Sequence, residues 1–226
     1  MRATHSHAIG QKAGQSLYYA FEQAERVGLP LTAHVTIAFA ATRCDPTLIL
    51  AAFSRLRRNL FNKWAVRNGF APTGAYAFEN VRDEVPFTVM EPGDDHNVHA
   101  HWAVYIPAQL RHRFEMELLT WIEAVTGGIV DHAVVLRVTY PGALRLRSYL
   151  LKGLNPQWAS IYGAFAKAQG VIVGGRRTGT TANISRSKRI AADRVLGIRR
   201  RIPARPHGNE APRPGAADNH FAPGAI

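Results

Sequence analysis

Two histidines separated by one residue lie in an apolar stretch of the sequence, where they could hold a metal ion. His99 and His101 flank Ala100 within residues 97–106, NVHAHWAVYI, a stretch typical of a buried β-strand. Side chains alternate between the two faces of a strand, so both imidazoles leave the same face. Imidazole is a common ligand of divalent metals in proteins. The spacing therefore predicts a metal site on one face of this strand.

Tyr149 and Lys152 form a second group that could do chemistry. We expect both on a helix over residues 143–154, where residues three or four apart share a face and Arg145 joins them. Two cations beside a phenol favour its deprotonated, nucleophilic form, and they can neutralise charge that develops on a phosphate. A tyrosine of this kind near a metal ion is typical of an enzyme that nicks a DNA strand.

A carboxylate usually completes such a metal site, and the sequence offers two sources for it. Glu79 ends a predicted strand that should pair with the histidine strand, so it is the acid best placed beside the two imidazoles. The loop between these strands carries the carboxylates of Asp94 and Asp95 and the imidazole of His96, any of which could be the third ligand if the loop folds back. Two histidines and one carboxylate with open coordination positions suit Mg²⁺ or Mn²⁺ acting on a phosphate.

The elements that must position these groups follow from hydrophobic periodicity and from Gly and Pro at their ends. Their order, β-α-β-β-α-β-α, predicts an α+β fold of the ferredoxin-like or RRM-like type. In that fold an antiparallel sheet carries its helices on one face, and we expect the other face to be open for a ligand. The predicted strands are residues 31–40, 73–80, 97–106 and 131–139, and the predicted helices are residues 46–64, 108–126 and 143–154.

The chain is predicted to divide into three parts. Residues 1–28 form an N-terminal extension with a short helix, and residues 29–175 form the domain that holds the candidate site. Residues 176–226 form a basic C-terminal segment, which we expect to be disordered after about residue 198 because Arg, Pro, Gly and Ala dominate there.

Charge is unevenly distributed along the chain. The formal net charge is +12, and residues 176–205 carry +9 of it, with ten Arg or Lys and one acid, Asp193. Such an asymmetry predicts an anionic partner, most often nucleic acid. The basic residues are interleaved with Gly, Ser and Thr, which suits contact with phosphates more than reading of bases. The candidate DNA-binding residues are Arg145, Arg176, Arg177, Lys188 and Arg189.

Composition excludes several other classes of protein. One cysteine, Cys44, excludes an internal disulfide framework and favours a reducing cytoplasm. No stretch approaches the roughly 18 apolar residues of a membrane span, and the N-terminus lacks an apolar secretory signal, so we expect a cytoplasmic protein that does not contact a membrane. The motif GxxxxGK[ST] is absent, so no ATPase domain is expected within the chain.

The order of the motifs resembles that of the replication initiators of the HUH endonuclease superfamily, the rolling-circle Rep proteins of plasmids and phages. The resemblance runs from about Leu31 to Pro156. LTAHVTIAF resembles the first-motif strand of the family, HNVHAHWAVYIP its metal strand and SYLLKGLNP its nucleophile helix. Two positions depart from the family. Ala100 stands where a bulky apolar residue is usual, and Glu79 lies twenty residues before His99, where the family's acid commonly lies only a few residues before.

The resemblance implies a role for each residue of the two groups. His99, His101 and Glu79 would bind a divalent metal, Tyr149 would be the nucleophile, and Lys152 would assist it. The implied activity is nicking of single-stranded or hairpin origin DNA through a 5′-phosphotyrosine intermediate, which leaves a free 3′-hydroxyl for rolling-circle replication. A single tyrosine in the helix implies the one-tyrosine type. The implied partners are origin DNA and the host helicase and polymerase.

Three other interpretations are open. Conjugative relaxases place their tyrosine ahead of the histidines, where this chain has Tyr18 and Tyr19, and their three-histidine site would use His96 with His99 and His101. One-tyrosine transposases share the order of motifs, although they do not typically favour lysine at this position. A nucleic-acid-binding protein without chemistry would use the basic segment and the open face of the sheet.

Overall fold

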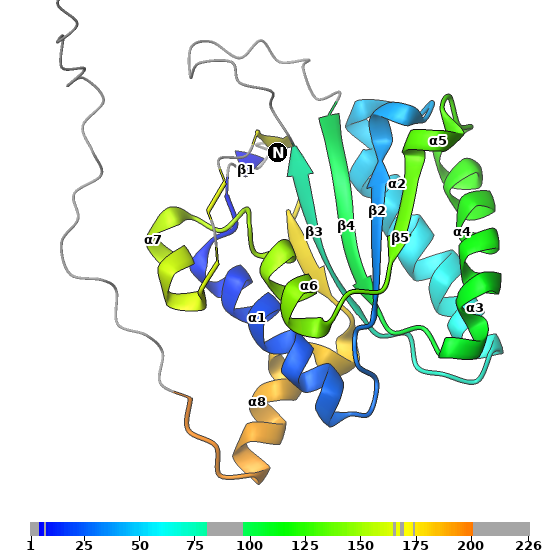
Figure 1. Cartoon of the computed structure of the whole chain (residues 1–226). Helices are drawn as coiled ribbons and strands as arrows, with labels where there is room; N and C mark the ends of the chain where they lie inside the picture. The colour runs from blue at the N-terminus through cyan, green and yellow to red at the C-terminus, as the bar shows by residue number, and fades with distance from the viewer. Residues whose placement is uncertain are drawn as a thin grey trace, which may run out of the picture.

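The computed structural model of the chain describes residues 5–6, 8–80, 97–164, 166–167, 170–173 and 175–200 (Figure 1). The alternative metal ligands Asp94, Asp95 and His96 lie outside the described residues, as do residues 201–226, which include most of the segment that we expect to be disordered. No helix in the described ranges is both long enough and apolar enough to cross a membrane.

Five strands form one antiparallel sheet in the order β5-β2-β4-β3-β7 (Figure 1). The first four strands in this order belong to two β-α-β units, one from β2 to β3 and one from β4 to β5. The units interleave, because β4 lies between β2 and β3, and β2 lies between β5 and β4. The α+β antiparallel fold predicted from the sequence is confirmed. The strands are β2 (Ala33–Ala38), β3 (Gly74–Asn80), β4 (Val98–Val104), β5 (Leu136–Thr139) and β7 (Thr178–Thr180).

One face of the sheet packs against helices that are rich in buried aromatic side chains. Phe53 and Phe61 of the first crossover and Phe114 of the second pack around Trp102 of β4, and Trp64 packs against Phe61 and Phe114. Burial of such large side chains is a main source of stability in a domain of this size. The first crossover is α2 (Ile49–Arg55), a π-helical segment (Leu56–Phe61) and α3 (Asn62–Arg67), and the second is α4 (Arg111–Thr126).

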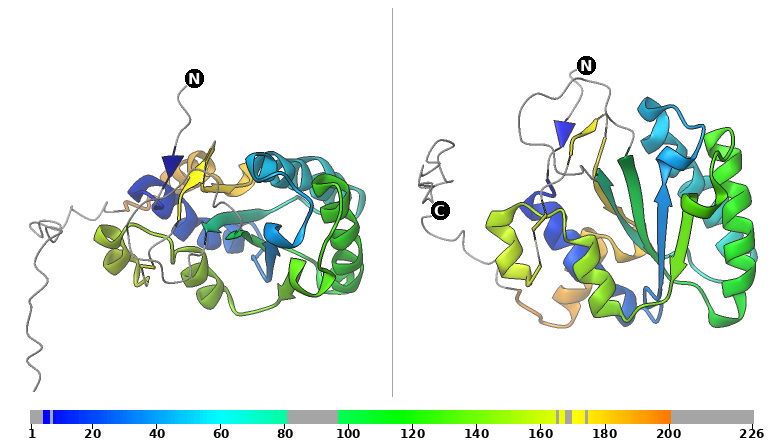
Figure 2. Two further views of the ribbon diagram at one scale, coloured as in Figure 1. Left: turned by 90° about the horizontal axis from the view of Figure 1, so that it is seen from above. Right: turned by 45° about the horizontal axis from the view of Figure 1, so that its top comes forward.

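The other face of the sheet is partly covered, whereas the sequence predicts that it is open. Leu17 and Phe21 of α1 (Gln11–Arg26) and Leu146 of α6 (Ala143–Leu150) form a second core over this face (Figure 2). The strands present alanines to these helices, including Ala75 and Ala103, and such small side chains let a helix approach a sheet closely. What remains accessible on this face is the part near the candidate site.

Two predicted elements differ in extent from what the sequence suggests. Residues 131–139 are not strand throughout, because Asp131 accepts a hydrogen bond from the Ala133 N–H (2.9 Å) and starts the short helix α5 (His132–Val135) ahead of β5. The helix predicted over residues 143–154 ends at Leu150, so Lys152 lies just beyond α6. The chain leaves the helix there because the Gly153 carbonyl accepts a hydrogen bond from the Ile9 N–H (2.8 Å).

Three small elements flank the site side of the sheet, and one of them, β6, contacts β3. The short helix α7 (Pro156–Ala159) follows α6, and a two-stranded ribbon is formed by β1 (His5–Ser6) and β6 (Ile172–Val173) (Figure 2). Asn80, the last residue of β3, binds this region directly: its side-chain amide donates to the Val171 carbonyl (3.0 Å), and its own carbonyl accepts from the Gly170 N–H (2.9 Å).

The described part of the basic segment, residues 176–200, folds back onto the domain. Its strand β7 pairs with β3 at the edge of the sheet, and its helix α8 (Arg186–Val195) packs beside α1 (Figure 1). Asp193 of α8 is buried, and its carboxylate accepts hydrogen bonds from Arg26 (2.8 Å) and Arg200 (2.7 Å). Arg200 also donates to Glu22 of α1 (2.7 Å). The only acid in this basic stretch therefore joins α8 to α1.

Replacement of Asp193 by Asn is expected to lower the free energy of unfolding at pH 7 by about 2 kcal/mol. The hydrogen bond from Arg200, together with that from Arg26, lowers the pKa of Asp193 to about 2. Because this pKa lies below the value in the unfolded chain, the stabilisation is fully present above about pH 4 and is lost as the pH falls towards 2. Urea unfolding of the wild-type chain and the Asp193→Asn variant at several pH values measures the difference.

The control is the replacement of Glu25, an exposed neighbour on α1, by Gln. It removes one negative charge close to the same helix and should change the stability by less than about 0.5 kcal/mol. A loss of stability in the Asp193 variant that does not shrink towards pH 2 would show that its carboxylate is not the source of the stabilisation.

Candidate metal site and the tyrosine beside it

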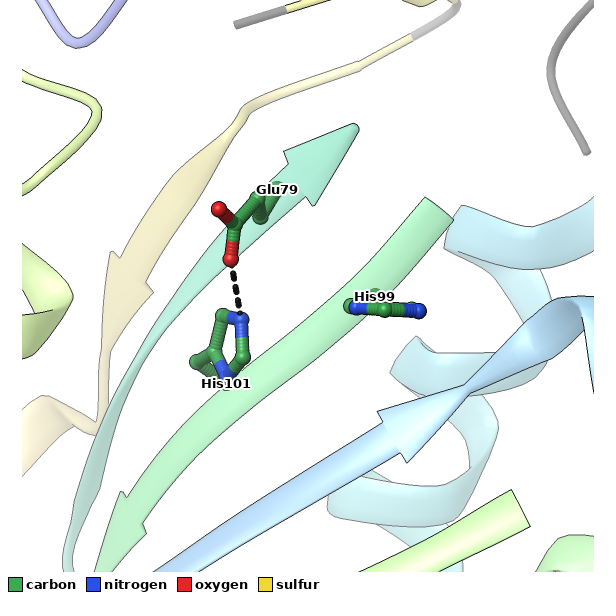
Figure 3. A group of neighbouring side chains, drawn as sticks. All are labelled: Glu79, His99 and His101. Carbon is green, nitrogen blue, oxygen red and sulfur yellow. Dashed lines mark hydrogen bonds and ion pairs between the residues drawn. The ribbon is translucent and has the colours of Figure 1, made fainter. Parts of the chain in front are cut away.

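The pairing of β3 with β4 brings Glu79 and the two histidines together. In the register of these strands Glu79 lies directly opposite His99, and Ala77 lies opposite His101. The three side chains share one face (Figure 3), and one potential ligand atom from each, a carboxylate oxygen or a ring nitrogen, lies within 4.8 Å of the other two. Glu79 and His99 are twenty residues apart in the sequence because the connection between the two strands lies between them. In space they are direct cross-strand neighbours.

Glu79 is buried and ionised. Its carboxylate accepts hydrogen bonds from His101 Nε2 (2.6 Å) and from the Lys152 ammonium, and Glu79 is only 4% exposed. Burial alone would raise its pKa, but the hydrogen bonds from His101 and Lys152 and the positive charge of Lys152 outweigh that effect and lower the pKa to about 2. The site therefore holds a fixed negative charge throughout the physiological pH range.

The two histidines are held in the neutral form that binds metals. Burial lowers the pKa of both His99 and His101, most directly because the charged ring would lose its hydration. His101 is 2% exposed, and Thr36 Oγ1 on β2 lies 3.2 Å from its Nδ1. With Nε2 donating to Glu79, the Thr36 hydroxyl donates to Nδ1. With a metal on Nε2 the ring would take the other tautomer, in which Nδ1–H donates to Thr36 Oγ1, the arrangement typical of histidines at metal sites.

The donor set fits a divalent ion. Two neutral imidazoles and one ionised carboxylate converge from adjacent strands, and such a set leaves coordination positions for water or substrate. The Lys152 ammonium contacts Glu79 Oε2, the same oxygen that binds His101. A divalent ion bound between these residues would neutralise the negative charge of Glu79, which Lys152 neutralises without the ion.

Tyr149 lies directly beside this cluster. Its ring centroid is 4.8 Å from that of His101 and 4.9 Å from that of His34. Lys152 Nζ lies 3.9 Å from the centre of the Tyr149 ring, so this one ammonium touches both the tyrosine and Glu79. Tyr149 is nevertheless 39% exposed, which leaves it accessible to a polymer that passes over the site.

Sequence reasoning missed His34 of β2. Its side chain shares a face with Thr36, and its ring lies 5.5 Å from that of His101 and also contacts Tyr149. Burial lowers its pKa to about 4, so the ring is neutral, and its buried Nε2 has no hydrogen-bond partner among the described residues. Strand alternation within residues 33–38 could have found it, because His34 and Thr36 are the two polar residues of an otherwise apolar strand.

The predicted DNA-binding arginines and lysine divide into two groups. Arg145, Arg176 and Lys188 are exposed, whereas Arg177 and Arg189 are buried. Arg177 donates to the Phe78 carbonyl (3.1 Å) and to the Gly170 carbonyl (2.5 Å), beside Glu79 on β3. Arg189 reaches the Asp193 carboxylate (3.4 Å). The two buried arginines therefore make contacts within the fold.

The two tyrosines of the relaxase interpretation lie in other surroundings. Tyr18 of α1 packs against Tyr162 and beneath the Arg147 guanidinium. Tyr19 lies against the guanidinium groups of Arg189 and Arg200. Neither has a described contact with the Glu79, His99 and His101 cluster, whereas Tyr149 contacts His101.

No protein-family model, no curated protein and no solved structure matches the chain. The geometry of the site itself must therefore support any function that is proposed for it.

Proposed function

We propose that the protein is a metal-dependent endonuclease that nicks single-stranded DNA, with Tyr149 as the nucleophile. The observation that carries the proposal is the contact between Tyr149 and His101, which places an accessible phenol beside a candidate metal site. The proposed class is that of the one-tyrosine replication initiators of the HUH type, which the sequence resembles.

Each residue of the site would have a distinct task. Glu79, His99 and His101 would hold Mg²⁺ or Mn²⁺, which supplies polarisation of the scissile phosphodiester when bound. Glu79 would give the site its negative charge, and Thr36 would fix the orientation of the His101 ring through Nδ1.

Lys152 would link the metal site to the nucleophile. Its ammonium contacts Glu79 and lies against the Tyr149 ring. If a divalent ion compensates Glu79, Lys152 becomes free to stabilise the negative charge of the attacking phenolate or of the phosphate in the transition state. It would therefore be a catalytic residue in the complex with DNA.

The proposed reaction exchanges one phosphodiester for another. Tyr149 Oη forms a bond to phosphorus, and the bond from phosphorus to the 3′ oxygen of the preceding nucleotide breaks. The phenol gives up its proton to solvent, and the departing 3′ oxygen takes one up. The products are a 5′-phosphotyrosine link and a free 3′-hydroxyl, which a polymerase can extend.

The proposed partners follow from the charge and from this product. Origin DNA, single-stranded or extruded as a hairpin, would contact exposed cations such as Arg145, Arg176 and Lys188. The nicked strand would pass to a host helicase and polymerase. A polymerase is included because a free 3′-hydroxyl is the group that it extends.

The test is an adduct assay on a panel of end-labelled single strands of different sequence. Incubation with Mn²⁺ should produce a band of protein-linked DNA on a denaturing gel, and EDTA should abolish it. Binding without any adduct in Mn²⁺ or Mg²⁺ would overturn the nicking proposal and favour a nucleic-acid-binding protein without chemistry.

A further inference from the structure

A pocket of about 450 Å³ opens beside Tyr149. It lies between the edge of the sheet, formed by β5 and β2, and the start of α6, and Tyr149 itself forms part of its wall. The volume is in the range of pockets that hold a small organic ligand, such as a single nucleotide. Neither the metal ligands nor Lys152 line this pocket, so it is separate from the metal site although it shares Tyr149.

The pocket is lined by two exposed arginines that form no ion pair among the described residues. Arg137 of β5 and Arg145 of α6 both line it, and neither has an ion pair with an acid within the described part of the chain. None of the described residues that line the pocket is acidic. This contrasts with Arg26, Arg189 and Arg200, whose guanidinium groups bind carboxylates. Guanidinium groups held without partners beside a cavity suit a phosphate.

The rest of the wall suits the uncharged part of a nucleotide. Leu146 supplies apolar surface, and Thr139 supplies a hydroxyl. His34 lines the pocket too, as a neutral ring.

We propose that this pocket holds one nucleotide of the single-stranded DNA, next to the scissile phosphate, with its phosphate on Arg137 and Arg145. The inference rests on the proposed function, since Tyr149 joins the pocket to the nicking site. It adds to that function a subsite and two residues, Arg137 and Thr139, that the sequence does not single out.

The test measures DNA binding in EDTA, so that cleavage plays no part in the result. The probe is a fluorescein-labelled dT12 strand, and the full chain is titrated in fluorescence anisotropy at 150 mM salt. The double replacement of Arg137 and Arg145 by Ala should weaken binding by at least about tenfold. The matched control replaces Arg55 and Arg67, which are exposed on α2 and α3 beyond the other face of the sheet, and it should weaken binding by less than about threefold.

A second variant separates a pocket from a diffuse positive surface. Thr139→Trp fills the space without changing any charge, and it should weaken binding of dT12 about as much as loss of the two arginines. Thr139→Val removes only the hydroxyl and keeps the volume, so it should weaken binding less than Thr139→Trp does. Thermal unfolding checks that each variant folds, and the arginine pair alone decides the question if the Trp variant does not fold.

The possible results separate this inference from the nicking proposal. Equal weakening by the pocket pair and the control pair, or unchanged binding in a folded Thr139→Trp chain, would overturn the pocket even if the wild type nicks DNA. Selective weakening by the pocket variants in a protein that forms no adduct with Mn²⁺ would support the pocket as a nucleotide site and overturn only the nicking.

Discussion

Replacement of Tyr149 by Phe is expected to reduce the yield of covalent protein–DNA adduct by at least about 1,000-fold. The substitution removes only the phenolic oxygen, the atom proposed to attack phosphorus, and it keeps the ring that packs against His34 and His101. Folding and the affinity for single-stranded DNA should therefore change by less than about threefold. A denaturing gel of labelled strand incubated with Mn²⁺ measures the adduct, and anisotropy in EDTA measures the affinity.

The matched controls are Tyr18→Phe and Tyr19→Phe on α1. Both remove the same atom from tyrosines that contact Tyr162, Arg189 or Arg200 instead of the candidate metal site, so the adduct should form at nearly the wild-type rate. An adduct that persists in Tyr149→Phe but disappears in either control would favour the relaxase arrangement, with its nucleophile near the N-terminus.

Replacement of His99 or His101 by Ala is expected to weaken Mn²⁺ binding by at least about 100-fold. Each substitution removes one of the three candidate ligands on β3 and β4. Even the loss of a residue that only hydrogen-bonds to a metal ligand typically lowers the metal affinity about 10- to 100-fold. Isothermal titration of Mn²⁺ measures the affinity without reference to cleavage. Adduct formation at a fixed Mn²⁺ concentration below the variant's dissociation constant should fall in parallel.

The control for this experiment is His112→Ala, an exposed histidine on α4 beyond the other face of the sheet, which should leave Mn²⁺ binding unchanged. The third ligand is tested separately by Glu79→Gln, which keeps the shape of the side chain and removes its charge. If that variant binds Mn²⁺ normally while Asp95→Ala does not, the third ligand comes from the segment between β3 and β4 instead.

The strand pattern was enough to predict how the candidate metal ligands come together. The His-x-His spacing fixes a common face on β4, and the prediction that residues 73–80 and 97–106 pair as neighbours puts Glu79 beside that face. Both inferences depend on the two-residue period of a strand, which tertiary contacts rarely overturn. The α+β sheet could be predicted for the same reason, from the alternation of strands and amphipathic helices.

Features that depend on tertiary contacts could not be predicted in this way. Arg177 and Arg189 belong to a segment whose composition is typical of DNA binding. In the fold both side chains are buried, and they donate to a backbone carbonyl and to a carboxylate. The strand predicted from residue 131 begins only at Leu136, because a local hydrogen bond to Asp131 competes with extended structure. Helix α1 packs over the second face of the sheet against alanines that come from different strands. These alanines are far apart in the sequence, so no local pattern predicts that they form one surface.

The contact between Arg177 and β3 has a consequence for synthesis of the protein on the ribosome. The chain is made from the N-terminus, so Glu79, both histidines, Tyr149 and Lys152 have all been translated before Arg177 and β7 exist. Yet β7 supplies the edge strand beside β3, and Arg177 binds the carbonyl of Phe78, next to Glu79. A nascent or prematurely terminated chain that ends before residue 177 therefore carries every proposed site residue but lacks β7 and the Arg177 contact beside Glu79. We expect the site to assemble only when translation is nearly complete, so that incomplete chains do not attack DNA.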